Sequence, residues 1–170
     1  IAVLILVPTR ELAIQVNEVF KDYTSFLPFN CKTMAVYGGT SVNIQMKTMS
    51  NVSILVATPG RLLDLISSNA VHLDEVKTFV IDEADKMLNL GFKEELNKII
   101  SLLPKKRQNL LFSATLNPNI ESLNRVILNN PLVICTKAQL KSVLVNSNGL
   151  FICGIKSLAR TIGPATKWGK

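Results

Sequence analysis

Short runs of apolar, often β-branched residues alternate along this chain with longer segments in which apolar residues recur at helical spacing. The runs predict strands at residues 2–7, 32–37, 53–57, 78–81, 109–112 and 132–135. The segments between them predict helices at 10–26, 40–49, 60–68, 84–103 and 118–128. Nearly continuous apolar strands separated by helices are typical of a parallel sheet that helices cover on both faces. The pattern therefore predicts an α/β fold, a doubly wound parallel sheet in three layers.

Two parts of the chain depart from that regular alternation. The helical segment 84–103 carries one apolar stripe, but Gly91 interrupts it and predicts a break there. After Cys135 the alternation fades, and only residues 150–153 could form one more short strand. We therefore predict a folded body over residues 1–136 and a tail or linker over 137–170.

Composition excludes several classes of protein. Hydrophobic residues make up 48% of the 170, which argues against disorder. The longest apolar run, residues 1–7, is too short to span a bilayer, so no membrane is expected as a partner. Three widely spaced cysteines predict neither a disulfide framework nor a zinc site, and they favour a reducing, cytoplasmic location. His72 is the only histidine, which excludes histidine-based triads and multi-histidine metal sites.

The net charge of +7 is unevenly distributed. Residues 137–170 hold six Lys and Arg and no acidic residue, whereas residues 1–136 hold 13 Lys and Arg against 12 Asp and Glu. The basicity therefore belongs to the tail, and it is no reason to expect that the body binds polyanions.

The strongest functional signal is a set of short motifs that directly follow five of the predicted strands. Parallel strands end at the same edge of a sheet, so motifs that follow them should gather around a shared pocket. In chain order they are Pro-Thr-Arg-Glu-Leu-Ala (8–13), Gly-Gly (38–39), Thr-Pro-Gly-Arg (58–61), Asp-Glu-Ala-Asp (82–85) and Ser-Ala-Thr (113–115).

The acidic motif favours a magnesium site over a structural ion pair. Asp82 and Glu83 follow a buried strand, where carboxylates without partners would cost free energy. Magnesium prefers carboxylate oxygens and keeps most of its waters. One carboxylate could hold such an ion through those waters while its neighbour takes a proton from the attacking water. Ser113 and Thr115 would place hydroxyl groups beside them.

The Thr-Pro-Gly-Arg motif offers donors to an anion. Thr58 suits the N-cap of the following helix, with Pro59 at its first position. The free amides of Gly60 and Arg61 would then point beyond the helix end, where an anion is favoured. The Arg61 guanidinium adds a forked donor that matches phosphate.

Two further motifs fit the same ligand. Thr9 and Arg10 repeat the pairing of a hydroxyl cap with a guanidinium. Gly38 and Gly39 offer backbone amides without side chains, so a sugar–phosphate strand could approach closely. Donors of this kind contact the nucleic-acid backbone and not the bases, so binding would be largely independent of sequence.

Together these five motifs resemble the DEAD-box ATP-dependent RNA helicases, in the order and spacing of the first of that family's two RecA-like domains. The resemblance covers about residues 1–135, and residues 137–170 show no recognisable match to the family's linker or second domain. It implies a RecA-like fold that uses ATP and magnesium, and a second RecA-like domain as a partner. The implied function couples ATP binding and hydrolysis to local unwinding of short RNA duplexes.

The same resemblance implies a role for each motif. Asp82 would hold the magnesium of ATP through water, and Glu83 would polarise the water that attacks the γ-phosphate. Asp85 would pair with the Ser113 and Thr115 hydroxyls and so link the ATP site to strand separation. The residues expected to grip the RNA sugar–phosphate chain are Pro8, Thr9, Arg10, Gly38, Gly39, Thr58, Pro59, Gly60 and Arg61.

Two parts of that family's pattern are missing from these 170 residues. The sequence contains no G-x-x-x-x-G-K-[ST], whose usual place, the first strand and its loop, lies before Ile1. The second RecA-like domain, which supplies arginines to the phosphates, is also missing. Because phosphoryl transfer depends on positioning and electrostatic stabilisation, we expect the 170 residues alone to hydrolyse ATP negligibly.

The missing strand also matters for the sheet. In the family it lies beside the strand that ends at Ser113, so without it residues 109–112 would have an unpaired edge. Residues 150–153 are the one segment that could fill the place.

Another class of function remains open. A non-catalytic RNA-backbone-binding domain could use residues 8–10, 38–39 and 58–61 without ATP. A two-component receiver domain is excluded because its acidic cluster would include the end of the first strand, which is Pro8-Thr9 here.

Overall fold

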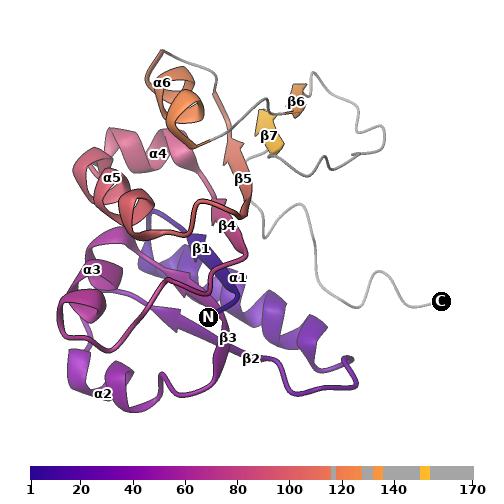
Figure 1. Cartoon of the computed structure of the whole chain (residues 1–170), viewed down its shortest axis with the longest axis vertical. Helices are drawn as coiled ribbons and strands as arrows, with labels where there is room; N and C mark the ends of the chain where they lie inside the picture. The colour runs from indigo at the N-terminus through magenta and orange to yellow at the C-terminus, as the bar shows by residue number, and fades with distance from the viewer. Residues whose placement is uncertain (116–117, 128–131, 136–149, 154–170) are drawn as a thin grey trace.

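A computed structural model of the chain describes residues 1–115, 118–127, 132–135 and 150–153. Within these residues the strands form one sheet in the order β2-β3-β1-β4-β5-β7-β6, and all the pairings are parallel (Figure 1). The strands are β1 (Val3–Leu6), β2 (Lys32–Val36), β3 (Val52–Ala57), β4 (Thr78–Ile81), β5 (Gln108–Ser113), β6 (Leu132–Cys135) and β7 (Leu150–Cys153). The helices are α1 (Arg10–Thr24), α2 (Val42–Lys47), α3 (Pro59–Ser67), α4 (Ala84–Asn89), α5 (Lys93–Leu102) and α6 (Pro118–Ile127). The predicted α/β fold with a parallel sheet is confirmed.

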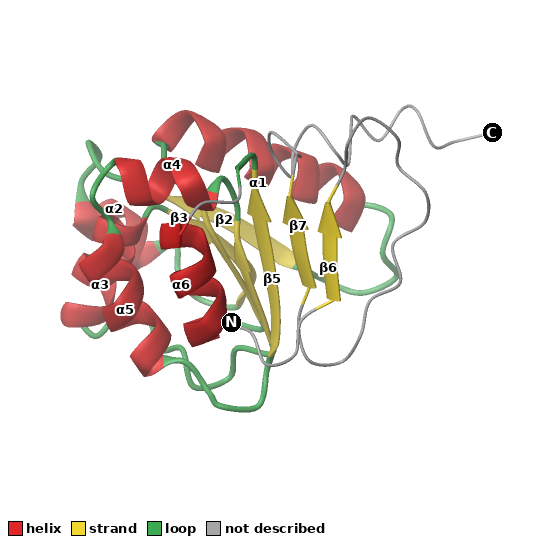
Figure 2. Ribbon diagram, turned by 90° about the horizontal axis from the view of Figure 1, so that it is seen from above, coloured by secondary structure: helices red, strands yellow, loops and turns green. Residues whose placement is uncertain are grey.

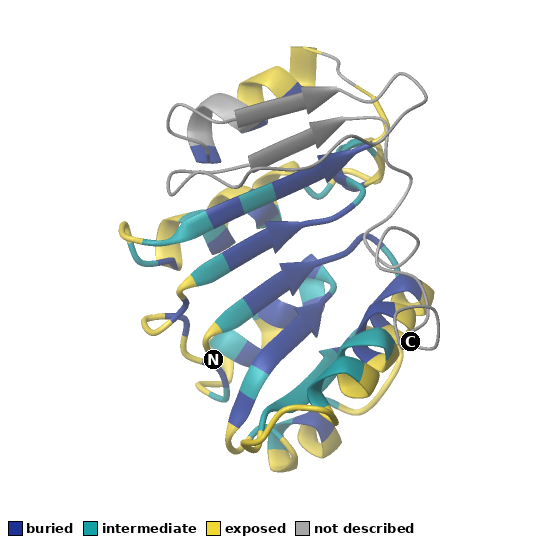
Figure 3. Ribbon diagram, turned by 90° about the vertical axis from the view of Figure 1, so that its right-hand side faces the viewer, coloured by how far each residue is buried: buried dark blue, intermediate teal, exposed yellow. Residues whose placement is uncertain are grey.

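Helices cover both faces of the sheet, because successive strand residues point to opposite sides. In β1, Leu4 and Leu6 pack into a cluster with buried residues of α3, α4, α5 and α6. Ile5 and Val7 point the other way and pack with Val16 of α1. Figure 2 shows α1 on one side of the sheet and α3, α5 and α6 on the other. The central strands are buried along most of their length (Figure 3), as expected for a parallel sheet between two helical layers.

Local sequence signals set the helix boundaries. The Thr9 hydroxyl caps α1 by accepting a hydrogen bond from the Leu12 N–H at 3.3 Å. Thr58 is the N-cap of α3 and Pro59 its first residue, although the Thr58 side chain makes no capping bond. Between α4 and α5, Gly91 has a φ of +89°, a conformation that side chains with a Cβ rarely adopt. The predicted helix break near Gly91 is confirmed.

Strand β7 fills the place beside β5. Leu110 of β5 pairs with Leu150, and Ser113 pairs with Cys153, in parallel register. On its outer side β7 pairs with β6. The prediction of an unpaired edge at residues 109–112 is therefore wrong, and the alternative that residues 150–153 fill the place is confirmed. An exposed strand edge presents free N–H and C=O groups, which a further strand satisfies.

The remaining residues of the predicted tail, 137–149 and 154–170, lie outside the described residues. Across the described part of the chain, no helix combines the length and the apolar character that a membrane crossing requires.

Candidate functional site

The carboxyl ends of the strands bring the five motifs to one edge of the sheet (Figure 1). Backbone hydrogen bonds continue the sheet past the strand ends and into the motifs themselves. The Asp82 N–H donates to the Leu6 carbonyl at 2.9 Å, and the Thr58 N–H donates to the Val36 carbonyl at 3.1 Å. The acidic motif is thereby fixed beside the end of β1, and the start of α3 beside the end of β2. The expectation that these motifs share an edge is confirmed.

The acidic motif begins with a fully buried carboxylate. Asp82 has no exposed surface, and its Oδ1 accepts a hydrogen bond from the Glu83 N–H at 3.0 Å. Glu83 has a φ of +51°, in the left-handed region. A residue with a Cβ held there costs about 1–3 kcal/mol, and such strain is concentrated at functional sites.

The Glu83 carboxylate is only partly satisfied. Its Oε2 lies 3.2 Å from the Lys86 Nζ, one turn along α4, so the two charges attract each other. No hydrogen bond to this oxygen is found among the described residues, so the Lys86 charge is its close partner there. Because the lysine side chain is exposed, the pair is weak. Glu83 can therefore still accept a hydrogen bond or a proton from a ligand.

A hydrogen bond links the acidic motif to the end of β5. The Thr115 hydroxyl donates to the Asp85 Oδ2 at 3.1 Å. The Ser113 hydroxyl donates instead to the Thr115 carbonyl at 2.8 Å and accepts from the Thr115 N–H at 3.4 Å. Of the two expected partners of Asp85, Thr115 is thus in direct contact with it. Ser113 instead hydrogen-bonds to the backbone of Thr115.

The residues that follow β1 and β2 come together at the edge of the sheet, although β3 lies between the two strands. A Cβ built on Gly39 would lie 3.5 Å from the Arg10 Nη1, so the guanidinium lies against this glycine. The Arg10 side chain is 55% exposed, and its Nε donates to the Glu11 Oε1 at 3.2 Å. The pKa of the Glu11 carboxyl is lowered, first by its hydrogen bond with its own backbone N–H and then by Arg10. Because this ion pair is exposed, it is weak, and Arg10 can turn toward a ligand.

Gly39 and Gly38 provide a matched pair of substitutions. Gly39 has a φ of +86°, so Gly39→Ala is expected to lower the free energy of unfolding by about 1–2 kcal/mol, the cost of a left-handed residue with a Cβ. A Cβ at Gly38 would meet nothing within 4 Å, so Gly38→Ala is expected to change it by less than about 0.5 kcal/mol. Thermal denaturation of both variants measures the difference. Equal effects would contradict the assigned backbone geometry.

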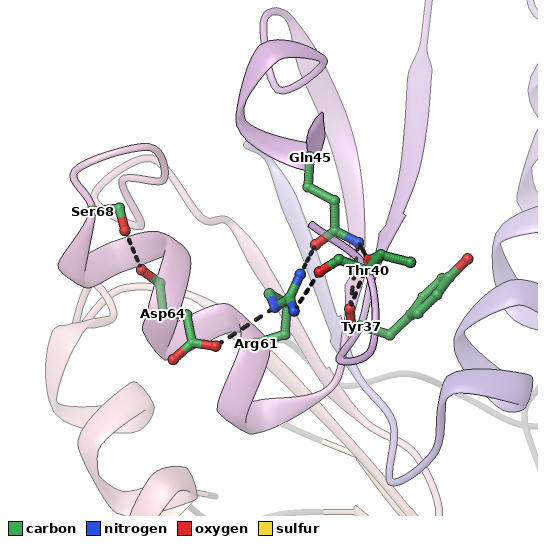
Figure 4. Close-up of polar contacts among 6 residues, drawn as sticks. All are labelled: Tyr37, Thr40, Gln45, Arg61, Asp64 and Ser68. Carbon is green, nitrogen blue, oxygen red and sulfur yellow. Dashed lines mark hydrogen bonds and ion pairs between the residues drawn. The ribbon is translucent and has the colours of Figure 1, made fainter. Parts of the chain in front are cut away.

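Arg61 lies inside the protein. Its side chain is 8% exposed, with Nη1 donating to the Gln45 Oε1 at 2.8 Å and Nη2 to the Thr40 carbonyl at 2.9 Å (Figure 4). Its Nε lies 3.5 Å from the Asp64 Oδ2. The sequence predicts that this forked donor faces a phosphate, whereas here both arms of the fork are bound to protein oxygens. Gln45 gave no signal in the sequence, because a polar residue in a short helix is ordinarily exposed, whereas Gln45 is buried. Thr40 gave none because it is an exposed loop residue that contributes its carbonyl.

The predicted RNA-gripping residues therefore differ in exposure. Some are exposed, some are partly buried, and some are buried. In that order they are Arg10, Gly38 and Gly39; Thr9, Thr58 and Gly60; and Pro8, Pro59 and Arg61.

Comparison with known families identifies the chain. A family model described as DEAD/DEAH box helicase matches residues 1–123. The chain belongs to this family. The chloroplastic DEAD-box ATP-dependent RNA helicase 3A of Zea mays is 47% identical over 133 residues, which cover 78% of this chain and 17% of that protein. The mitochondrial DEAD-box ATP-dependent RNA helicase 9 of Arabidopsis thaliana is 40% identical over 167 residues, which cover 96% of this chain and 27% of that protein.

Solved structures of DEAD-box proteins share the fold. A DEAD box protein from the hyperthermophile Methanococcus jannaschii matches with a TM-score of 0.73 and 35% identity, over 91% of this chain and 37% of that one. The yeast DEAD-box splicing factor Prp28 matches with a TM-score of 0.67 and 36% identity, over 72% of this chain and 30% of that one. The RecA-like fold that the motifs implied is confirmed.

The extent of these matches bears on two expectations. The chain spans only 17% and 27% of the two helicases from plants. A match that covers 96% of the chain includes part of residues 137–170, so the resemblance to the family extends beyond residues 1–135. The two helicases are named as chloroplastic and mitochondrial proteins, so the cytoplasmic location stays a prediction.

Proposed function

We propose that this DEAD-box chain is part of an ATP-dependent RNA helicase, in which it couples ATP hydrolysis to local separation of short RNA duplexes. The hydrogen bond between Thr115 and Asp85 carries the proposal, because it joins the acidic motif at the end of β4 to the end of β5. A change at the nucleotide site then moves the neighbouring strand end through one side-chain contact. RNA as the substrate is supported by the names of the related helicases.

The acidic motif would serve the nucleotide. Asp82 and Glu83 present the hard carboxylate oxygens that magnesium prefers, and Asp82 would hold the ion through water. Among the described residues, no three His, Cys, Asp or Glu side chains gather closely enough to hold a metal ion. We expect the magnesium ion to bind together with ATP. When bound, the ion would neutralise the negative charge that develops on the phosphates during transfer. Glu83, whose Oε2 is paired only with the exposed Lys86 among the described residues, would orient the attacking water and accept its proton.

The exposed motif residues would grip the RNA backbone. Arg10 offers a cation at the surface, and Gly38 and Gly39 leave their backbone accessible beside it. At the start of α3 the Thr58 hydroxyl makes no capping bond, and Gly60 has open space around its Cα, so a phosphate could approach the helix end. These donors contact phosphate and sugar, so binding would not depend on base sequence.

A strand-release assay on the full-length protein tests this function. Thr115→Val keeps the side-chain volume but removes the hydroxyl that donates to Asp85. We expect ATP hydrolysis to persist while ATP-dependent release of a short RNA strand slows by about 10- to 100-fold, since a hydrogen bond to a charged group contributes about 1.5–3 kcal/mol. Release is followed by the fluorescence of a labelled strand.

Thr24→Val is the matched control, because the Thr24 hydroxyl donates to the Lys21 carbonyl at the exposed end of α1. It should leave both activities unchanged. RNA binding that is independent of nucleotide, with no release of a strand by the wild-type protein, would favour the alternative of a non-catalytic RNA-backbone binder.

A further inference from the structure

We propose that Gln45 and Arg61 are positioning residues that fix the loop 37–41, and that Arg61 does not itself bind a phosphate. The inference rests on the proposed function, since this loop carries the two glycines expected to contact the RNA backbone. It assigns a role to Gln45, which belongs to none of the five motifs, and it changes the role expected for Arg61.

Gln45 connects α2 to the loop on both sides of the glycine pair. Its side chain is buried, 7% exposed. Its Nε2 donates to the Thr40 Oγ1 at 2.7 Å and to the Tyr37 carbonyl at 3.4 Å (Figure 4). Its Oε1 accepts from the Arg61 Nη1 at 2.8 Å. Both ends of the amide are therefore used, and a flipped amide would face its NH₂ group toward the guanidinium.

Arg61 completes the network from α3. Its Nη2 donates to the Thr40 carbonyl at 2.9 Å, directly after the glycines. If the guanidinium turned toward a phosphate, the buried Gln45 Oε1 and the Thr40 carbonyl would both lose a charged donor, which costs free energy. The exposed Asp64 carboxylate lies 3.5 Å from the Nε and adds a charge on the side away from the loop. These contacts therefore keep the Arg61 guanidinium inside the protein, directed toward Gln45 and Thr40.

The loop needs such support because its own residues provide little. Gly38 and Gly39 have no side chains to pack, and Gly39 has a φ of +86°. An unsupported glycine pair would sample many conformations and would lose that freedom when RNA binds. Polar anchors at Tyr37 and Thr40 fix the backbone before binding, so less free energy is lost on association.

Salt dependence distinguishes positioning from direct contact. A cation that neutralises a phosphate releases counterions, so it adds about 0.7 to the slope of log affinity against log salt for single-stranded nucleic acid. A residue that only orders the loop changes the affinity and leaves this slope unchanged.

The test measures the binding of a labelled oligouridine by the full-length protein at several salt concentrations. We expect Gln45→Met and Arg61→Met each to weaken binding by about tenfold, through the lost hydrogen bonds, without changing the slope. Arg61→Lys keeps the charge but not the fork, so it should weaken binding as much as Arg61→Met. Arg10→Met is the matched control, an exposed arginine on the same edge, and it should reduce the slope by about 0.7.

Backbone NMR order parameters without RNA provide a second readout. Those of residues 38–41 should fall in Gln45→Met and Arg61→Met relative to the wild type, whereas in Arg10→Met they should stay unchanged. If Arg61→Met lowers the order parameters throughout the sheet and not only in this loop, Gln45→Glu carries the test, since it keeps the acceptor for Arg61 but loses both donors to the loop.

Three results would overturn the inference: a slope that falls by about 0.7 in Arg61→Met, full binding by Arg61→Lys, or unchanged order parameters at residues 38–41 in Gln45→Met. A wild-type protein that does not bind oligouridine would instead refute the proposed function, and the order parameters would still decide whether the network holds the loop.

Discussion

Replacing Glu83 with glutamine is expected to lower the rate of ATP hydrolysis by the full-length protein by about 10²–10⁴-fold, the usual contribution of a general base. Glutamine has nearly the same shape and leaves the left-handed backbone at this position unchanged, but it is not able to take a proton from water. The affinity for ATP should change little, because Glu83 is proposed to act on the water and not on the nucleotide. Steady-state kinetics with RNA present should therefore show a lower kcat at a nearly constant KM.

Two controls separate this effect from general electrostatics. Lys86→Met removes the cation 3.2 Å from the Glu83 Oε2 but keeps the carboxylate, so kcat should change by less than about tenfold, in line with a pair whose lysine is exposed. Glu11→Gln removes an exposed carboxylate from the neighbouring helix α1 and should have no effect. If Glu83→Gln hydrolysed ATP at the wild-type rate, another group would have to serve as the base.

The sequence predicts the fold well because its signals are local. Apolar runs mark each strand, Thr9 and Pro59 mark the starts of two helices, and Gly91 marks a break between two others. The five motifs are expected at one edge of the sheet because strands joined by single helices run parallel, so all of them end on the same side. None of these conclusions requires knowledge of which strands are neighbours.

What the sequence does not predict depends on pairing between distant residues. The neighbour of β5 on the side away from β4 is β7. The sequence offers residues 150–153 only as a candidate for this place, and the pairing of Leu110 with Leu150 and of the residues after them establishes it. The partners of Arg61 lie 16 and 21 residues earlier in the chain, on another helix and in a loop. The residue type identifies a forked donor, but the fold decides whether protein or ligand accepts from it.

The contact between Asp85 and Thr115 lies between these cases. The two residues are 30 positions apart, and spacing alone gives no reason to pair them. The resemblance to a known family supplied that expectation, and the parallel pairing of β4 with β5 explains it, since the two strands end side by side. Family knowledge thus contributes most where a contact links two strand ends.

Phe79→Ala is expected to lower the free energy of unfolding of this domain by about 3–5 kcal/mol, the cost of truncating a buried aromatic ring. Phe79 is fully buried in β4, and β4 pairs with β1 on one side and β5 on the other. The Arg107 guanidinium also lies 5.8 Å from the centre of its ring. Hydrogen–deuterium exchange of peptides from β1 and β4 measures the change as lost protection.

The same variant separates stability from chemistry, because Asp82 and Glu83 follow β4 directly. If the domain has the usual stability of about 5–15 kcal/mol, Phe79→Ala stays mostly folded at low temperature, where it should keep a kcat close to the wild-type value. Activity should then disappear at a lower temperature than in the wild type, in contrast to Glu83→Gln, which is impaired at every temperature. Phe26→Ala is the control, since that ring is 78% exposed and its loss should change stability by less than about 0.5 kcal/mol. A Phe79→Ala protein with wild-type protection in β4 would show that this strand does not form the centre of the sheet.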